Sequence, residues 1–446
     1  MKILCIAPPM IPSYFNAGHR LWLFSVGAYL RKALPGAEVR CLDAAALNLH
    51  WKNVGDVLCD GWDVVCMHND FDGIDGFERF IYYARRLCPG AKLVTFGRLS
   101  SLVPALFHRF ELDAIVDSGD FEAGVEDAIR HLAHGDDPAG VRLRSRGFAA
   151  PARDGRRLAA EDWVLPDVAE IPYAAYGKMY LEDRDKFCGI PGRQELVVPV
   201  ARGCTVGCAY CDVPAIQGSR ERRLSVDRTV RYIRDAFAAA PFEYVSFYAP
   251  TFTLNRRWVV ELCDALEPDR VPWKCVTTLA HLAEPLVARM GRAGCVRISV
   301  GLETLAGGGA RSLPIIKQDV EAQLRAVAGW CRAAGIELNC FVILGLPGDS
   351  PEGVDYTIRV VTALGARVRP TIYTDYQKIT AAMAPFEVAQ FNRQLLTPDE
   401  LPEEVAAGYH RTFFGRKDAR TEVSARIPAR APDREEPHAG REEPRV

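Results

Sequence analysis

The sequence predicts an α/β protein made of two parallel-sheet units, an open doubly wound sheet and then a partial (β/α)6 barrel, with a small helical segment at the C-terminal end. Three observations lead to this prediction. The chain of 446 residues is longer than most single domains. Apolar strand-like runs alternate with amphipathic helical stretches, and a segment rich in Arg, Pro, Gly and Ala divides this alternation into two series. The predicted boundaries are 1–135 for the open sheet, 136–190 for a linker, 191–378 for the barrel, 379–416 for the helical segment and 417–446 for a disordered tail.

The first unit has the alternation of an open, doubly wound sheet. Strands are expected in MKILCIAPP, AEVRCLDA, WDVVCMHND, AKLVTFG and LDAIVDSG, and helices over about 22–33, 76–87 and 122–133. No G-x-G-x-x-G follows the first strand, so the dinucleotide fingerprint is missing. Ligands of such sheets bind beyond the carboxyl ends of the strands. The residues expected there are Pro8, Pro9, Met10, His68, Asn69, Asp70, Gly97, Arg98, Ser118 and Gly119.

The second unit alternates six strands with helices, as a partial parallel barrel requires. Its strands are expected in ELVVPVA, YVSFYA, WKCVTTL, VRISVGLE, ELNCFVILGLPG and VRPTIYTDY. Helices are expected over about 226–239, 256–266, 284–293 and 320–334, and in SPEGVDYTIRVVTAL. Parallel barrels carry their chemistry at the carboxyl ends of the strands, where this sequence has its polar and glycine residues.

Beyond the barrel, one helix is expected in TPDELPEEVAAGYHRTFFG, with Pro398 and Asp399 as start signals. After Arg416 the chain is dense in charge and poor in apolar residues. Such a segment cannot bury enough apolar surface to fold, so we expect it to be disordered.

Composition and charge argue against several classes of function. The 55 basic and 57 acidic residues leave a net charge of −2, which gives no basic field for nucleic acid. No apolar run reaches the roughly eighteen residues of a membrane helix, and the N-terminal residues are typical of a strand instead of a signal peptide. We therefore expect a cytoplasmic protein with reduced thiols. Most of the 14 cysteines lie in apolar runs as small buried hydrophobes, for example Cys5, Cys66, Cys263, Cys295 and Cys340.

Three cysteines have different surroundings. Cys204, Cys208 and Cys211 lie among glycine and polar residues in VARGCTVGCAYCDVP, directly after a strand-like run. A zinc site usually needs a fourth Cys or His close by, and within about sixty residues only the isolated Cys263 follows. An iron-sulfur cluster is held by thiolates, and a four-iron cluster with three protein ligands leaves one iron open to a small molecule. The pattern therefore favours a 4Fe-4S cluster over zinc.

The spacing C-x3-C-x2-C, with Tyr210 just before the last cysteine, resembles the radical S-adenosylmethionine enzymes. The resemblance implies that the open iron is chelated by S-adenosylmethionine. It also implies that Tyr210 packs by the adenine and that Glu303, in ISVGLETL, holds polar groups of the same ligand, so both are candidate catalytic residues. Further residues that the resemblance places around this cofactor are Ser246, Thr304, Gly345, Leu346 and Pro347.

Two segments depart from the family pattern. After the second barrel strand the relatives commonly carry an acidic residue, whereas this chain has Ala249 and Pro250. After the fourth strand comes the glycine run AGGGARSLP. Both lie near the expected substrate mouth, so the identity of the substrate does not transfer from the family.

A doubly wound domain directly before such a barrel resembles the cobalamin-dependent subfamily, and implies cobalamin as a third cofactor beside the strand ends given above. The segment EIPYAAYGKMY resembles the extended segment that enters the barrel in these proteins. The Asp-x-His-x-x-Gly signature of many corrinoid domains is absent. We therefore assign no protein ligand to the cobalt, although His68 is a candidate; a radical enzyme without a corrinoid remains an alternative.

The resemblance implies a radical S-adenosylmethionine methyltransferase that moves a methyl group through methylcobalamin to a carbon of a small-molecule or peptide natural-product precursor. A flavodoxin or ferredoxin is expected as electron donor. The wording CTVGCAYCDVP also resembles the tryptophan 2-C-methyltransferase subgroup, where the acceptor is an indole carbon. Alternatives are cyclisation, rearrangement or oxidation without methyl transfer, and a noncatalytic zinc or scaffold protein.

Overall fold

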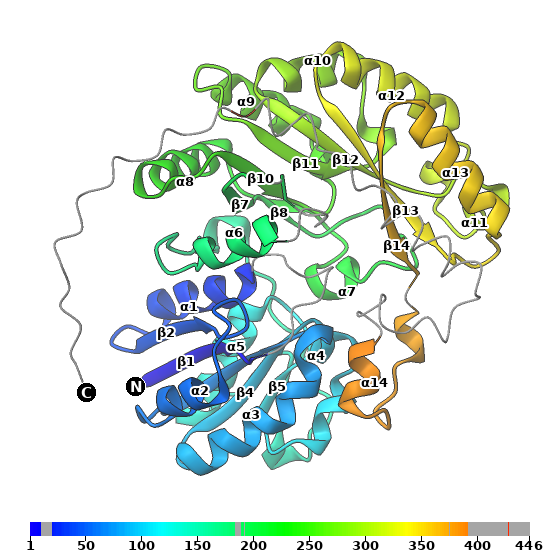
Figure 1. Cartoon of the computed structure of the whole chain (residues 1–446). Helices are drawn as coiled ribbons and strands as arrows, with labels where there is room; N and C mark the ends of the chain where they lie inside the picture. The colour runs from blue at the N-terminus through cyan, green and yellow to red at the C-terminus, as the bar shows by residue number, and fades with distance from the viewer. Residues whose placement is uncertain (10–19, 183–188, 191, 374, 391–426, 428–446) are drawn as a thin grey trace, which may run out of the picture.

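The computed structural model describes residues 1–9, 20–182, 189–190, 192–373, 375–390 and 427. Within them the chain forms two six-stranded sheets, one in each half (Figure 1). This confirms the predicted fold class of an N-terminal doubly wound, Rossmann-like sheet followed by a partial barrel.

The N-terminal sheet has the strand order β2-β1-β3-β4-β5-β6. All neighbours are parallel except β5 and β6, which pair antiparallel. The order reverses at β1, which lies between β2 and β3, so a crevice is expected at the carboxyl ends there. The strands are β1 (Lys2–Ala7), β2 (Glu38–Asp43), β3 (Val64–Asn69), β4 (Lys92–Gly97), β5 (Ala114–Val116) and β6 (Val141–Leu143).

Helices cover both faces of this sheet because its strands are apolar on both sides. In β1, Ile3 and Cys5 pack into one core with the helices α1 (Leu21–Ala33) and α5 (Phe121–His134). Leu4 and Ile6 belong to a second core on the opposite face. The helices on that face are α2 (Trp51–Leu58), α3 (Ile74–Leu87) and the short α4 (Arg98–Leu102).

The second sheet is an open barrel of parallel strands in the order β14-β13-β12-β11-β10-β7. Five helices surround it: α8 (Val226–Ala239), α9 (Arg256–Leu266), α10 (Glu284–Arg292), α12 (Glu321–Ala333) and α13 (Pro351–Ala363). The strands are β7 (Glu195–Pro199), β10 (Tyr244–Tyr248), β11 (Trp273–Thr277), β12 (Cys295–Glu303), β13 (Glu337–Leu344) and β14 (Arg367–Ile372).

Capping residues explain where several barrel helices begin. The Ser225 hydroxyl accepts a hydrogen bond from the backbone N–H of Arg228, and Asn255 does the same for Trp258. Ser350 caps α13, whose first residue is Pro351. These side chains satisfy N–H groups that a helix leaves unpaired in its first turn. The bounds of α8 and α9 are those expected from the sequence.

The segment between the two sheets differs from the prediction. Strand β6 joins the N-terminal sheet, so that sheet extends beyond the expected boundary at residue 135. Residues Tyr173–Glu182 form the helix α6, where an extended segment was expected. The reason is a long-range anchor, since the Tyr176 hydroxyl donates to Asp43 at 2.5 Å and accepts from the backbone N–H of Arg20 at 3.2 Å.

The remaining elements are short. Strands β8 (Ala201–Arg202) and β9 (Arg222–Arg223) pair antiparallel around α7 (Val213–Gln217), and α11 (Gly307–Ala310) follows β12. Helix α14 (Pro385–Gln390) lies against α3. The helix predicted in residues 397–415 and the predicted disordered tail lie outside the described residues, apart from Ile427. None of the described helices combines the length and apolar character that a membrane crossing requires.

Candidate active site

The three clustered cysteines lie in the loop between β8 and α7. All three are partly exposed and line one cavity of about 420 Å³, whereas most other described cysteines are buried. The loop needs glycine where it turns: Gly203 has φ of +84°, and a Cβ there would lie 2.1 Å from the Arg220 carbonyl oxygen. The sequence thus builds a tight loop that presents its thiols to a cavity.

The donor set of the loop is three thiols that line one cavity, the ligand type that iron-sulfur clusters take. A zinc ion needs donors that converge on one point, whereas each thiolate of a four-iron cluster binds a different iron. Burial raises the pKa of the Cys211 thiol to about 11, so a bound metal must displace its proton.

A buried polar triad forms another wall of the same cavity. The Tyr210 hydroxyl donates to Glu303 Oε1 at 2.7 Å, and Lys317 Nζ lies 2.5 Å from that same oxygen and 3.0 Å from the Tyr210 hydroxyl. Burial alone would lower the pKa of Lys317, but Glu303 beside it raises that pKa above its usual value. Burial and Glu303 likewise raise the pKa of Tyr210. The triad therefore holds the Lys317 ammonium directly against Glu303.

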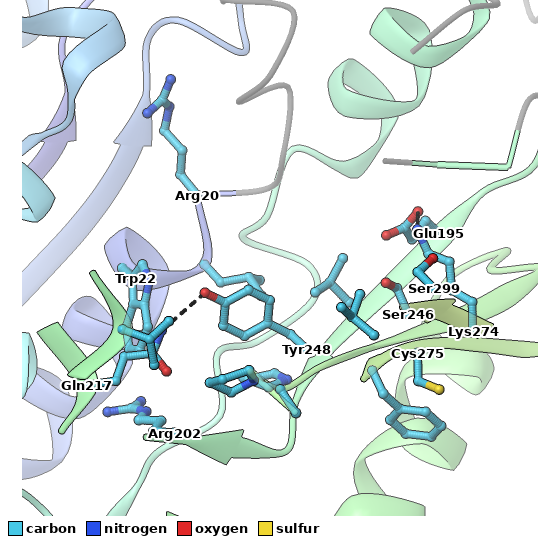
Figure 2. A pocket seen from close by; sticks show the side chains of 18 of the residues that line it. Arg20, Trp22, Glu195, Arg202, Gln217, Ser246, Tyr248, Lys274, Cys275 and Ser299 are labelled. Atoms are coloured by element: carbon cyan, nitrogen blue, oxygen red, sulfur yellow. Dashed lines mark hydrogen bonds and ion pairs between the residues drawn. The ribbon is translucent and has the colours of Figure 1, made fainter. Parts of the chain in front are cut away.

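A second cavity, of about 440 Å³, lies between the N-terminal sheet and the barrel (Figure 2). Trp22 of α1 stands on its N-terminal side, and Tyr248, the last residue of β10, accepts a hydrogen bond from the Gln217 amide at 3.3 Å. Other side chains extend into the cavity from the barrel strands: Glu195, Ser246, Lys274, Cys275 and Ser299. We call this cavity the interdomain cavity and the other the cysteine cavity.

The two cavities adjoin. Five residues line both of them: Val213, Pro250, Val276, Phe341 and Arg369. The Arg369 guanidinium stands 4.8 Å from the centre of the Phe341 ring. A molecule in the interdomain cavity therefore shares a wall with one in the cysteine cavity.

The residues expected at the N-terminal strand ends have different places. His68 and Asp70 line the interdomain cavity, and Arg98 lines the cysteine cavity. Asn69 is tied into the sheet, since its amide donates to Thr95 at 2.8 Å. Gly97 must be glycine because a Cβ would lie 2.0 Å from the Asn69 carbonyl oxygen.

The other expected N-terminal residues are not found at the cavities. The Ser118 hydroxyl accepts from the backbone N–H of Gly155 at 3.0 Å, and Gly119 packs against the same linker residue. Pro8 and Pro9 follow β1 at the same sheet edge but line neither cavity among the described residues. Met10 lies outside the described part of the chain.

The expected barrel residues divide similarly. Tyr210 and Glu303 line the cysteine cavity, and Ser246 lines the interdomain cavity instead. Thr304 is buried beside Thr357, with their hydroxyl oxygens 3.4 Å apart. Leu346 belongs to a small apolar cluster against which Tyr210 packs, between Gly345, which has φ of +79°, and Pro347.

Sequence reasoning missed several lining residues. Lys317 follows the glycine run after β12, in a stretch without periodicity, and nothing local indicates its burial. Asp212 and Tyr376 lie within hydrogen-bond reach of Arg98 only through tertiary contacts. In the sequence, Trp22, Tyr248 and Phe341 resemble ordinary core aromatics. The alternation of side chains along a strand predicts which face of the sheet Tyr248 and Phe341 occupy, but it does not predict which cavity they line.

Comparison with known proteins agrees with this geometry. Residues 198–361 match the model of the radical SAM superfamily. A bacteriochlorophyllide d C-12(1)-methyltransferase from Chlorobaculum tepidum is 27% identical over 115 residues, which are 25% of this chain and 25% of that protein. The similarity thus spans a quarter of the curated relative's length.

Solved structures extend the likeness to both sheets. The radical S-adenosylmethionine methyltransferase TsrM from Kitasatospora setae, with tryptophan and a SAM analogue bound, superposes with a TM-score of 0.67 at 17% identity, over 84% of this chain and 73% of its own. The cobalamin-dependent S-adenosylmethionine radical enzyme OxsB, with aqua-cobalamin bound, gives 0.65 at 14% identity, over 88% and 56%. The chain therefore carries a radical SAM domain at residues 198–361, within the two-domain fold that it shares with TsrM and OxsB.

Proposed function

We propose that this protein is a cobalamin-dependent radical S-adenosylmethionine methyltransferase, which moves a methyl group from S-adenosylmethionine through cobalamin to a substrate carbon. One observation carries the proposal: the cysteine cavity and the interdomain cavity share a wall of five residues. Chemistry that passes between two cofactors and a substrate needs the three in adjoining spaces. The fold shared with TsrM and OxsB supports the same assignment.

The cysteine cavity fits a 4Fe-4S cluster with bound S-adenosylmethionine. Cys204, Cys208 and Cys211 would hold the cluster and leave one iron for the amino-acid end of that ligand. Tyr210 and Glu303 offer a ring and a carboxylate in the same space. When bound, the cluster and S-adenosylmethionine supply one-electron and methyl-donor chemistry, and cobalamin supplies a methyl carrier.

The N-terminal wall of the interdomain cavity offers a polar group toward a corrinoid bound at the strand ends. His68 is 6% exposed, and its Nδ1 has no hydrogen-bond partner among the described residues. Burial, together with the Arg20 cation nearby, lowers the pKa of His68 to about 3, so the imidazole is neutral. A neutral imidazole with an unused nitrogen, at the carboxyl end of β3, suits a polar or metal-bearing ligand.

The substrate would occupy the barrel side of the interdomain cavity. Tyr248 of β10 and Phe341 of β13 offer aromatic surfaces to a planar apolar group such as an indole, and they keep water from it. Lys274 lies 3.2 Å from Glu195, so this wall also offers charge to a polar substituent. A small molecule, or one side chain of a peptide, fits a space of this size.

The state of the cysteines bears on the cellular compartment. The thirteen described cysteines are all free, which suits a reducing compartment. We therefore infer a cytoplasmic enzyme. Reduction of the proposed cluster also requires an electron donor, for which we propose a flavodoxin or ferredoxin.

Transfer of a labelled methyl group tests the function. The protein is reconstituted without oxygen with iron, sulfide and cobalamin, then incubated with methyl-labelled S-adenosylmethionine, a reductant and candidate indole or peptide substrates. We expect a labelled product together with S-adenosylhomocysteine, and neither with Cys208→Ala. A product without label would contradict methyl transfer and favour cyclisation, rearrangement or oxidation.

A further inference from the structure

A buried ion pair stands beside the cysteine loop. Lys317 is 8% exposed and Glu303 is 5% exposed, and 2.5 Å separates their charged atoms. Tyr210, which lies between Cys208 and Cys211 in the chain, hydrogen-bonds with both partners. The pair therefore reaches the cysteine loop through a single side chain.

The backbone is distorted to place this pair. Glu303 has φ of +65°, a left-handed conformation that non-glycine residues rarely adopt. The pairing of β12 with β13 shifts register between Gly301 and Glu303. A Cβ on Gly301 would lie 2.6 Å from Glu303 Oε1 and 3.0 Å from Lys317 Nζ, so a glycine makes the room.

A buried ion pair is not the most stabilising set of side chains for this space. Desolvation offsets most of the attraction in a buried ion pair, and apolar residues of similar size often stabilise a protein as well or better. Left-handed backbone at a non-glycine residue adds a further cost. A distorted, buried pair at this position indicates a role in the site.

The charged groups of the pair share a cavity with the thiols. Lys317 and Glu303 line the cysteine cavity together with Cys204, Cys208 and Cys211, and both hydrogen-bond with Tyr210 in the thiol loop. The reduction potential of an iron-sulfur cluster depends on net local charge, hydrogen bonds and exposure. Reduction adds one negative charge to the cluster, so a cation nearby favours it and an anion opposes it.

We propose that Lys317 and Glu303 set the reduction potential of the cluster, with Lys317 offsetting the carboxylate that the ligand site requires. The inference rests on the proposed function, since it needs a cluster on Cys204, Cys208 and Cys211. Lys317 is then an electrostatic positioning residue and not a ligand.

The test is a redox titration of single and double variants of the full-length protein, reconstituted without oxygen. Dithionite supplies the electron that takes the cluster from the 2+ to the 1+ state, and electron paramagnetic resonance measures the reduced fraction at one fixed pH. We expect Lys317→Gln to lower the potential and Glu303→Gln to raise it. Each should change the ratio of oxidised to reduced cluster at least tenfold at a fixed potential, which is about 59 mV for one electron.

Further variants separate charge from packing. Lys317→Arg keeps the cation and should stay near the wild-type potential, and so should the double variant Lys317→Gln/Glu303→Gln, in which both charges are gone. The control is Arg85→Gln, which removes a partly buried cation paired with Asp113 at 2.8 Å in the N-terminal sheet. It should leave the potential unchanged.

The outcomes separate the two proposals. Wild-type protein that takes up no iron and sulfide would overturn the proposed function. A cluster that forms in all variants while Lys317→Gln and Glu303→Gln shift the potential in the same direction, or no more than Arg85→Gln does, would overturn this inference alone. If Lys317→Gln fails to fold, the potentials of Glu303→Gln, of the double variant and of Lys317→Arg still test the inference. A potential of Glu303→Gln equal to those of the other two variants would overturn it.

Discussion

Arg98, the first residue of α4 in the N-terminal domain, forms an ion pair with Asp212, the residue directly after Cys211. The same guanidinium donates to the Tyr376 hydroxyl, stands 3.9 Å from Asp70 and stacks 4.8 Å from the Phe71 ring centre. One side chain thus joins the cysteine loop to the end of the N-terminal sheet. Arg98 and Asp212 both line the cysteine cavity.

Arg98→Gln should loosen this joint. Removing one partner of a largely buried pair leaves the other charge buried without compensation. We therefore expect a loss of about 3 kcal/mol in the free energy of unfolding. Urea unfolding of Arg98→Gln, Asp212→Asn and the double variant measures the coupling between the two residues. Arg40→Gln removes an exposed partner of Asp60 and should cost less than about 1 kcal/mol. Strictly additive losses would show that Arg98 and Asp212 are not coupled.

Cys208→Ala should abolish cluster binding while both domains stay folded. The cysteine lies in a partly exposed loop, so its loss removes a ligand without opening a core. Iron and sulfide analysis after anaerobic reconstitution gives the cluster content, and far-ultraviolet circular dichroism reports the fold. Cys59→Ala, at an exposed cysteine of the N-terminal domain, is the matched control and should bind iron normally. Full iron and sulfide content in Cys208→Ala would show that this residue is not a ligand.

Gly301→Ala should damage the ligand site more than the fold. The added Cβ must displace Glu303 or Lys317, which stand 2.6 and 3.0 Å from its position. We expect the displaced carboxylate to weaken the binding of S-adenosylmethionine by about 1.4 kcal/mol, which raises the Kd about tenfold. Equilibrium binding to the reconstituted protein measures this Kd. Gly329→Ala, on an exposed face of α12 with nothing within 4 Å, should leave the Kd unchanged and stabilise the helix by roughly 0.5 kcal/mol. Equal Kd values for the two variants would contradict the role of Glu303.

His68 should make the folded protein sensitive to acid. Its pKa is lowered to about 3 in the folded state, so in the unfolded chain it takes up a proton near pH 6.5 while the folded protein does not. Stability contributed by the neutral form is therefore lost as the pH falls below 6.5, by about 2 kcal/mol at pH 5. Urea unfolding at pH 7 and 5 should show this extra loss in wild type and not in His68→Asn. Parallel losses in both proteins would mean that His68 is not buried neutral.

Local pattern was enough to predict most of the fold. Helices α8 and α9 begin after capping residues and carry clear apolar periodicity, so their bounds could be read directly. Helix α6 was missed because the bond from Tyr176 to Asp43 spans 133 residues. Strand β6 is only three residues long, and its antiparallel pairing to β5 gives no periodic signal.

The site was predictable only where a motif marks it. The spacing of Cys204, Cys208 and Cys211 indicates their chemistry without any structure. Lys317 could not be found this way, because its partner Tyr210 is 107 residues away and Glu303 is reached through a distorted turn. Arg98 was expected beside a corrinoid, and its contact with Asp212 depends on how the two domains pack.

The response of a reduced cluster to S-adenosylmethionine tests the central claim most directly. Protein reconstituted without oxygen should contain about four irons and four sulfides per chain, and one iron should be open. We predict that adding S-adenosylmethionine changes the electron paramagnetic resonance spectrum of the reduced cluster in wild type. A preparation without an iron-sulfide chromophore, or a cluster whose spectrum does not respond to S-adenosylmethionine, would contradict the account.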